Sequence, residues 1–341
     1  MINIFEYPFI YRELNKYLFD KDKFNLIIIN KFINSKRNYF LFEELIWYYS
    51  QIKDKWFFNN VVAIQINKLI TLPQRLKRLE VDFQNFTKED ILDFGNLIPN
   101  SVEYISVHHC KHFIPPYFNF KLSIYEVTEN IILDNVIELE TARISSNVKC
   151  LGRPYKLTIS NVGNSLTCQI PDSVEILNLR QVTSIKQNTI PNSVKKLRLN
   201  IRGIFNLEDV IPNSVVELEL FVEPINEQIK VNIPNSVKCL KISACSNLIL
   251  PNSLINLEIY NMDELQSFKM FSVTHLTLVG CYNSRSSHYN IPDCVIHLTI
   301  YNLNLKFTLY FNNVKFLKIT RECFEHFKDR ISGDVEITFI N

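Results

Sequence analysis

A ten-residue pattern, I-P-N-S-V-x-x-L-x-L, recurs along most of this 341-residue chain and constrains its fold more than any other feature. The near-complete copies begin at Ile98, Ile170, Ile190, Ile211, Ile233, Leu250 and Ile291. Weaker copies that keep only the apolar positions extend the series to about fifteen units with a period near 20 residues. A chain built in this way grows along one axis, so its length does not predict several globular domains.

Each unit predicts one short strand. In L-x-L, two aliphatic residues alternate with a polar one, so the aliphatic pair shares the buried face of the strand. Proline fixes φ and has no N–H, so it belongs in the turn that leads into the strand. The Asn, Asp and Ser that follow it can bond backbone groups which the turn leaves unpaired. One unit cannot bury its own apolar residues, so the units must stack, with parallel strands along one side.

The same block resembles the FNIP repeat, a relative of leucine-rich repeats that is found in social amoebae and giant viruses. The N-I-P context is present at Asn232–Pro234 and Asn290–Pro292, and Tyr289 keeps the family's aromatic position, whereas Val231 replaces it. The resemblance extends from about residue 60 to about residue 340 and brings no catalytic residues with it. It implies an interaction surface on a repeat solenoid, a leucine-rich-repeat-like parallel β-sheet horseshoe of about 15 short units.

Residues 1–55 differ in kind from the repeats and predict a small all-α N-terminal domain. Apolar residues follow helical spacing after Pro8, and a second apolar helix is expected through Phe24. A third helical stretch is expected at 39–51. The expected organisation is therefore a helical domain followed by a solenoid at 56–341.

Three blocks of this domain resemble an F-box, namely Leu14-Asn15-Lys16-Tyr17-Leu18, Asp22-Lys23-Phe24-Asn25-Leu26 and Ile29-Asn30-Lys31-Phe32. Their spacing fits the family, although Tyr7-Pro8 replaces the usual Leu-Pro and Lys23 stands where an aliphatic residue is common. The resemblance implies docking on the Skp-type adaptor of a cullin ubiquitin ligase. The adaptor-binding candidates are Leu14, Tyr17, Leu18, Phe24 and Ile28. The alternative is that these helices only cap the open edge of the first repeat.

The strand face opposite the core is the expected place for partner binding. The residue between the two L positions, and the residue just after the second, should project from it. Tyr, Phe and Arg are the types enriched in interface hot spots. For any single one of them, the alternative is an ordinary solvated strand residue. The protein-binding candidates are Arg180, Arg198, Phe221, Tyr260 and Tyr301.

Other classes of function find little support. With 37 Lys and Arg against 35 Asp and Glu, the net charge of +2 gives no general attraction to nucleic acid or to an anionic membrane. The chain has only 6 glycines and lacks the G-x-S-x-G and H-E-x-x-H motifs. The string from His108 to His112 carries zinc-binding types, but adjacent residues of an extended segment point in opposite directions. We therefore expect no enzyme activity, no cofactor and no metal.

The combined interpretation is a non-enzymatic, substrate-recognition adaptor of a Skp-cullin-type ubiquitin ligase. Its expected partners are a Skp-type adaptor and a protein substrate. The alternative is a structural or scaffolding repeat protein. The start of the sequence has no basic region followed by a long apolar stretch, so an intracellular location is expected, in the cytoplasm, or in the host cytoplasm for a viral chain.

Overall fold

The structure is a computed structural model that divides into two compact units, Met1–Pro154 and Tyr155–Asn341, here called the first and the second unit. Each is described by itself. The residues that the structure describes are 47–48, 63–68, 70–108, 119–127, 135–144, 148, 152–162, 169–202, 207–222, 231–243, 248–260, 272–280, 288–301 and 308–340.

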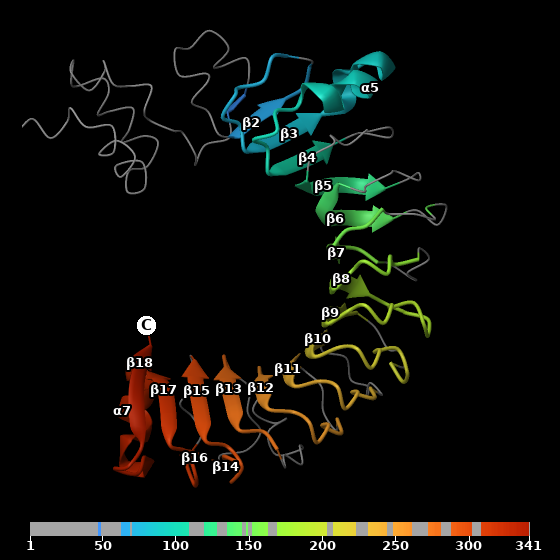
Figure 1. Cartoon of the computed structure of the whole chain (residues 1–341). Helices are drawn as coiled ribbons and strands as arrows, with labels where there is room; N and C mark the ends of the chain where they lie inside the picture. Colours follow the sequence, from blue (N-terminus) through green and yellow to red (C-terminus); the bar gives the residue numbers. More distant parts are fainter. Residues whose placement is uncertain are drawn as a thin grey trace, which may run out of the picture. The chain divides into compact units, whose positions relative to one another are not determined.

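Parallel strands in chain order build the first unit (Figure 1). Helix η4 (Phe83–Asn85) and helix α5 (Lys88–Leu97) lie between the third and fourth of them. The strands are β1 (Trp47–Tyr48), β2 (Ala63–Ile66), β3 (Arg78–Asp82), β4 (Tyr104–His108), β5 (Phe120–Val127) and β6 (Val136–Ile144).

Strand β1 corrects one expectation. Trp47 and Tyr48 lie in the stretch 39–51 that was expected to be helical, but they pair in parallel with Ile64 and Gln65 of β2. The helical prediction is wrong at these two residues, because aromatic residues suit strands and the pairing with β2 outweighs a helical spacing of apolar side chains. The five F-box-like candidates, from Leu14 to Ile28, lie outside the described residues. The boundary expected between residues 55 and 56 stays a prediction.

The second unit repeats the same arrangement, again with parallel strands that follow one another in chain order (Figure 1). A separate pair, β14 (His288–Asn290) and β16 (Thr308–Tyr310), forms a small parallel sheet. Helix α7 (Arg321–Phe327) and helix η5 (Lys328–Arg330) precede the last strand. The main strands are β7 (Lys156–Ile159), β8 (Ile176–Val182), β9 (Lys196–Ile201), β10 (Glu217–Val222), β11 (Cys239–Ser243), β12 (Asn256–Ile259), β13 (His275–Val279), β15 (His297–Tyr301), β17 (Phe316–Thr320) and β18 (Glu336–Ile340).

The register of these strands confirms the predicted parallel solenoid. Leu218 of β10 lies opposite Leu197 of β9 and Leu240 of β11, and Leu220 lies opposite Leu199 and Ile242. All six side chains are at most 1% exposed. The L-x-L pairs therefore form two continuous apolar rows inside the unit.

The proline turns of several repeats hold the repeat to the one before it. Ser236 is an exception, because its buried hydroxyl has no hydrogen-bond partner in the described part of the chain. The N–H of Val194 donates to the carbonyl of Pro191 at 3.2 Å, which closes the turn into β9. The hydroxyl of Ser193 donates to the carbonyl of Val174 in the preceding repeat at 2.8 Å, and Ser214 bonds Val194 in the same way. The recurring serine thus connects neighbouring repeats, beyond the local turn role that the sequence predicted.

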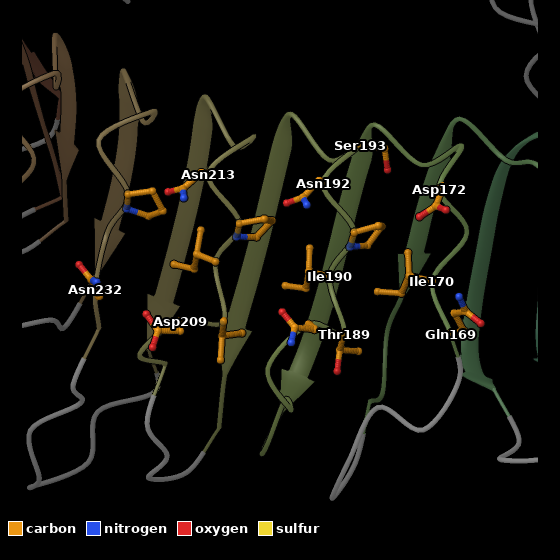
Figure 2. A pocket seen from close by; sticks show the side chains of 16 residues that line it. Gln169, Ile170, Asp172, Thr189, Ile190, Asn192, Ser193, Asp209, Asn213 and Asn232 are labelled. Carbon is orange, nitrogen blue, oxygen red and sulfur yellow. The ribbon is translucent and has the colours of Figure 1, made fainter.

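Figure 2 shows how these turns stack. Ile170 and Ile190 occupy equivalent places in successive repeats, and so do Asp172, Asn192 and Asn213. Together the turns line a groove of about 750 Å³. Its polar lining comes partly from the repeat motif, at Asp172, Asn192, Ser193 and Asn213. The other polar side chains come from the residues just before each motif, at Gln169, Asn188, Thr189, Asp209 and Asn232.

Candidate protein-binding face of the second unit

The strand face of the second unit carries three rows of side chains. We call them the leading, middle and trailing rows, after the position just before, between and just after the two L positions of each strand. The middle and trailing rows were predicted, whereas the leading row was missed. The signal for it was present, because the position before the first L also alternates with a buried residue. In the leading row lie Lys196, Glu217, Cys239, Asn256, His275, His297 and Phe316.

Three of the predicted residues form what we call the aromatic cluster: Arg198 on β9, Phe221 on β10 and Tyr260 directly after β12. The guanidinium carbon of Arg198 lies 5.1 Å from the centroid of the Phe221 ring, within the range of a cation–π contact. The rings of Phe221 and Tyr260 meet edge to face at 5.5 Å. Ser243 on β11 lies in register beside Phe221, and its small side chain leaves room for the two rings to meet across it.

Charges of opposite sign alternate along the middle row, from Arg198 through Glu219 and Lys241 to Glu258. Arg198 belongs both to this row and to the aromatic cluster. The nitrogen Nε of Arg198 lies 3.5 Å from Oε2 of Glu219, and Nζ of Lys241 lies 3.1 Å from Oε2 of Glu258. Ion pairs at a protein surface stabilise a fold by about 1 kcal/mol or less. Their main effect is that each charge next to the cluster is offset by a charge of opposite sign.

Tyr260 is held in place by its hydroxyl group. That group donates a hydrogen bond to Oε1 of Glu258 at 2.5 Å. Burial, followed by this hydrogen bond to a carboxylate, raises the pKa of Tyr260 far above its ordinary value of 10.0. The phenol therefore stays a neutral donor, and the edge of its ring stays fixed against Phe221.

A stack of flat rings lies on the leading row, next to the aromatic cluster. The rings of His275 and His297 are parallel at 4.2 Å, and those of His297 and Phe316 are parallel at 4.5 Å. The two histidines border a depression of about 290 Å³, whose lining also includes Lys241 and Glu258. The face thus offers an aromatic cluster and a shallow hollow, which are joined at Glu258.

The histidine stack gives a prediction on stability and pH. Burial, and then the neighbouring His297, lower the pKa of His275 below its ordinary value. The unfolded chain therefore takes up a proton at His275 from about pH 6.5 downward, before the folded chain does. We expect the contribution of His275 to the free energy of unfolding to be constant above this pH and to fall as the pH drops below it. Denaturant titrations at several pH values will show this, and His275→Gln should remove part of the fall.

The matched control for this prediction is His288→Gln, which changes an exposed histidine outside the stack. It should leave the pH profile close to that of the parent. An unchanged profile in the His275→Gln variant contradicts the prediction.

The two remaining predicted residues lie apart from the cluster. Arg180 is exposed on β8, where a positive φ of 52° at Gln181 accompanies a shift in register between β8 and β9. Tyr301 is 38% exposed at the end of β15. The structure therefore brings together three of the five candidates, and no described contact joins the other two to them.

The described residues contain no group of three or more His, Cys, Asp or Glu placed to hold a metal ion. Of the string 108–112, only His108 is described, and it is exposed. Burial raises the pKa of the Cys294 thiol, which disfavours a reactive thiolate. Within the described part of the chain, none of the helices has the length and apolar character needed to cross a membrane.

A protein-family comparison supports the repeat interpretation. The family model of the FNIP Repeat matches residues 183–222, which include β9 and β10 and therefore Arg198 and Phe221. No curated protein matches the chain. A solved structure titled "The crystal structure of CroV588 a novel circular LRR protein structure" aligns over 89% of this chain and 71% of its own, with 15% sequence identity and a TM-score of 0.33. The chain is thus a parallel β-sheet solenoid that carries FNIP-type repeats at residues 183–222.

Proposed function

We propose that this chain is a non-enzymatic protein-binding repeat protein that acts inside the cell as the substrate-recognition adaptor of a Skp-cullin-type ubiquitin ligase. Its second unit binds the protein substrate through the strand face. The observation that carries this proposal is the aromatic cluster of Arg198, Phe221 and Tyr260, which stands on a row of mutually neutralised charges.

The chemistry of this face suits a protein partner. Aromatic residues and arginine dominate hot spots, since they combine a large apolar area with a polar end. Tyr260 is already fixed by Glu258, so little side-chain freedom is lost when a partner covers it. A nucleic acid is disfavoured, because Lys196, Arg198 and Lys241 each pair with a glutamate.

The ligase half of the proposal rests on the F-box-like blocks around Leu14, Tyr17, Leu18, Phe24 and Ile28. A small helical domain that holds the adaptor, joined to a repeat surface that holds the substrate, brings the two partners together. The competing function is a scaffold whose N-terminal helices only cap the solenoid. The two functions differ in one property, binding to a Skp-type adaptor.

The test exploits the separation of the two surfaces. Tyr260→Ala should weaken binding of a co-purified protein substrate about thirtyfold, which equals about 2 kcal/mol, and should leave binding to a purified Skp-type adaptor unchanged. Ile28→Asp and Phe24→Asp should do the reverse. Affinities are measured by isothermal titration calorimetry on variants that still unfold cooperatively.

The matched control is Tyr125→Ala, which removes an exposed tyrosine from a strand of the first unit and should change neither affinity. A parent chain that does not bind the adaptor refutes the ligase function and leaves the scaffold in its place. Folded Tyr260→Ala and Phe221→Ala variants that bind substrate as the parent does show that the cluster is not the binding site.

A further inference from the structure

The last strand of the second unit leaves core positions uncovered. Ile337 and Phe339 of β18 lie in register with Leu317 and Ile319 of β17. These two residues of β17 are at most 1% exposed, whereas Phe339 is 47% exposed and Ile337 is half-buried. Among the described residues, β18 pairs with β17 alone. Its outer edge therefore has no described strand beside it, and part of its apolar face stays exposed.

Helix α7 covers this end only in part. The Phe324 ring packs edge to face on the Phe339 ring at 5.3 Å, and the guanidinium of Arg321 lies 5.6 Å from the centroid of the same ring. The helix commits its own buried residues, Cys323 and Phe327, to the interior. These contacts thus cover only part of the Phe339 side chain, and about half of it stays exposed.

The edge also lacks the features that keep sheet edges from pairing. Natural edge strands are protected by lysines, prolines, bulges or inward-pointing charges. The β18 sequence, Glu-Ile-Thr-Phe-Ile, has one charge at its first position, and its pairing with β17 is regular over all five residues. Such an edge accepts an additional strand through backbone hydrogen bonds.

We propose that the strand added to β18 is β18 of a second copy of this chain, paired antiparallel about a two-fold axis at Thr338. This register is self-complementary. It places Ile337 of each copy opposite Phe339 of the other copy, on the core side. Thr338 meets Thr338 on the strand face, and Glu336 meets Ile340, so no like charges are opposed.

The proposed pairing uses all five residues. Its three central pairs are of types that stabilise antiparallel sheets, aliphatic against aromatic and threonine against threonine. Moving the axis to Glu336 would set two carboxylates against each other. A two-fold axis perpendicular to the sheet keeps the core faces of both copies on the same side. Self-complementarity of this kind is what an isologous interface requires, and it selects a second copy over an unrelated strand.

The experiment uses charge at the two-fold axis. Thr338 is exposed, so Thr338→Lys and Thr338→Glu should leave the fold of each copy intact, as checked by circular dichroism. In the full chain, sedimentation equilibrium should give a dimer for the parent. Each charged variant should be a monomer, with a dimer dissociation constant raised at least about tenfold, because like charges directly opposite are destabilising. An equimolar mixture of the two variants should restore the dimer, and the matched control Thr338→Val should remain dimeric.

Two results overturn the proposal. One is a parent chain that is a monomer at every concentration studied. Protection of its β18 amides from hydrogen exchange would then assign the outer edge to another segment of the same chain. The other is a pair of charged variants that dimerise as tightly as the parent, which locates the interface elsewhere.

Discussion

Replacing Leu218 by alanine is expected to lower the free energy of unfolding by about 2–5 kcal/mol. Leu218 is 1% exposed and lies in register between Leu197 and Leu240. Its removal leaves a cavity that touches three successive repeats, and serine hydrogen bonds tie the turns into β9 and β10, which limits collapse. Urea titration followed by circular dichroism measures the loss.

The matched control is Leu97→Ala, the same substitution at a leucine that is 47% exposed. It should change the free energy of unfolding by less than about 0.5 kcal/mol. In a repeat protein the loss spreads through nearest neighbours, so hydrogen exchange in the Leu218 variant should increase first in β9, β10 and β11. A loss below about 1 kcal/mol would mean that Leu218 is not a tightly packed core residue.

The parallel register was predictable because it depends on a period of two that every repeat restates. Leu197 and Leu199 are separated by one outward residue, and a slip of one residue would turn one L-x-L pair to the opposite face. Arg198, Glu219 and Lys241 are expected to be exposed in a row on the opposite face. Their register confirms the row, but all three are half-buried. The sequence alone does not show that the Glu219 side chain is only 15% exposed. Strands about 4.8 Å apart let long neighbouring side chains cover a shorter one.

The aromatic cluster was predictable only as separate residues. Phe221 and Tyr260 belong to repeats that are not adjacent, and their contact depends on the small side chain of Ser243 between them. The stacked rings of His275 and His297 likewise arise from two repeats that happen to carry flat side chains at the same leading position. A consensus pattern describes the positions that the repeats share. Both features depend on side chains at variable positions, which differ from one repeat to the next.

Helix α5 was also missed, although a local signal for it exists. Thr87 and Asp90 form a capping box, in which the Thr87 hydroxyl accepts from the N–H of Asp90 and the Asp90 carboxylate accepts from the N–H of Thr87. The weak repeats around it keep only apolar strand positions and therefore predict strands alone. Strand β1 was missed for the opposite reason, since its pairing with β2 is a long-range interaction that leaves no local pattern.

Replacing Phe94 by alanine is expected to lower the free energy of unfolding by about 3–5 kcal/mol, the other large effect on this chain. Phe94 lies on α5 and is fully buried. Its ring meets the rings of Phe83 and Phe86 edge to face at 5.4 and 5.8 Å, and those two rings meet each other at 4.8 Å. This group of three rings docks α5 in the first unit, because a ten-residue helix is marginal in water without tertiary packing.

Phe94→Leu is the matched control, and it should cost clearly less because leucine fills most of the same space. Thr87→Ala provides a scale, since the loss of an N-cap costs about 1 kcal/mol. Hydrogen exchange in the Phe94→Ala variant should rise most in α5, η4 and β4, where the missing ring leaves its neighbours unsupported. If Phe94→Ala costs no more than Thr87→Ala, then α5 is held by its cap and not by the three rings, and the packing described for the first unit is not what stabilises this helix.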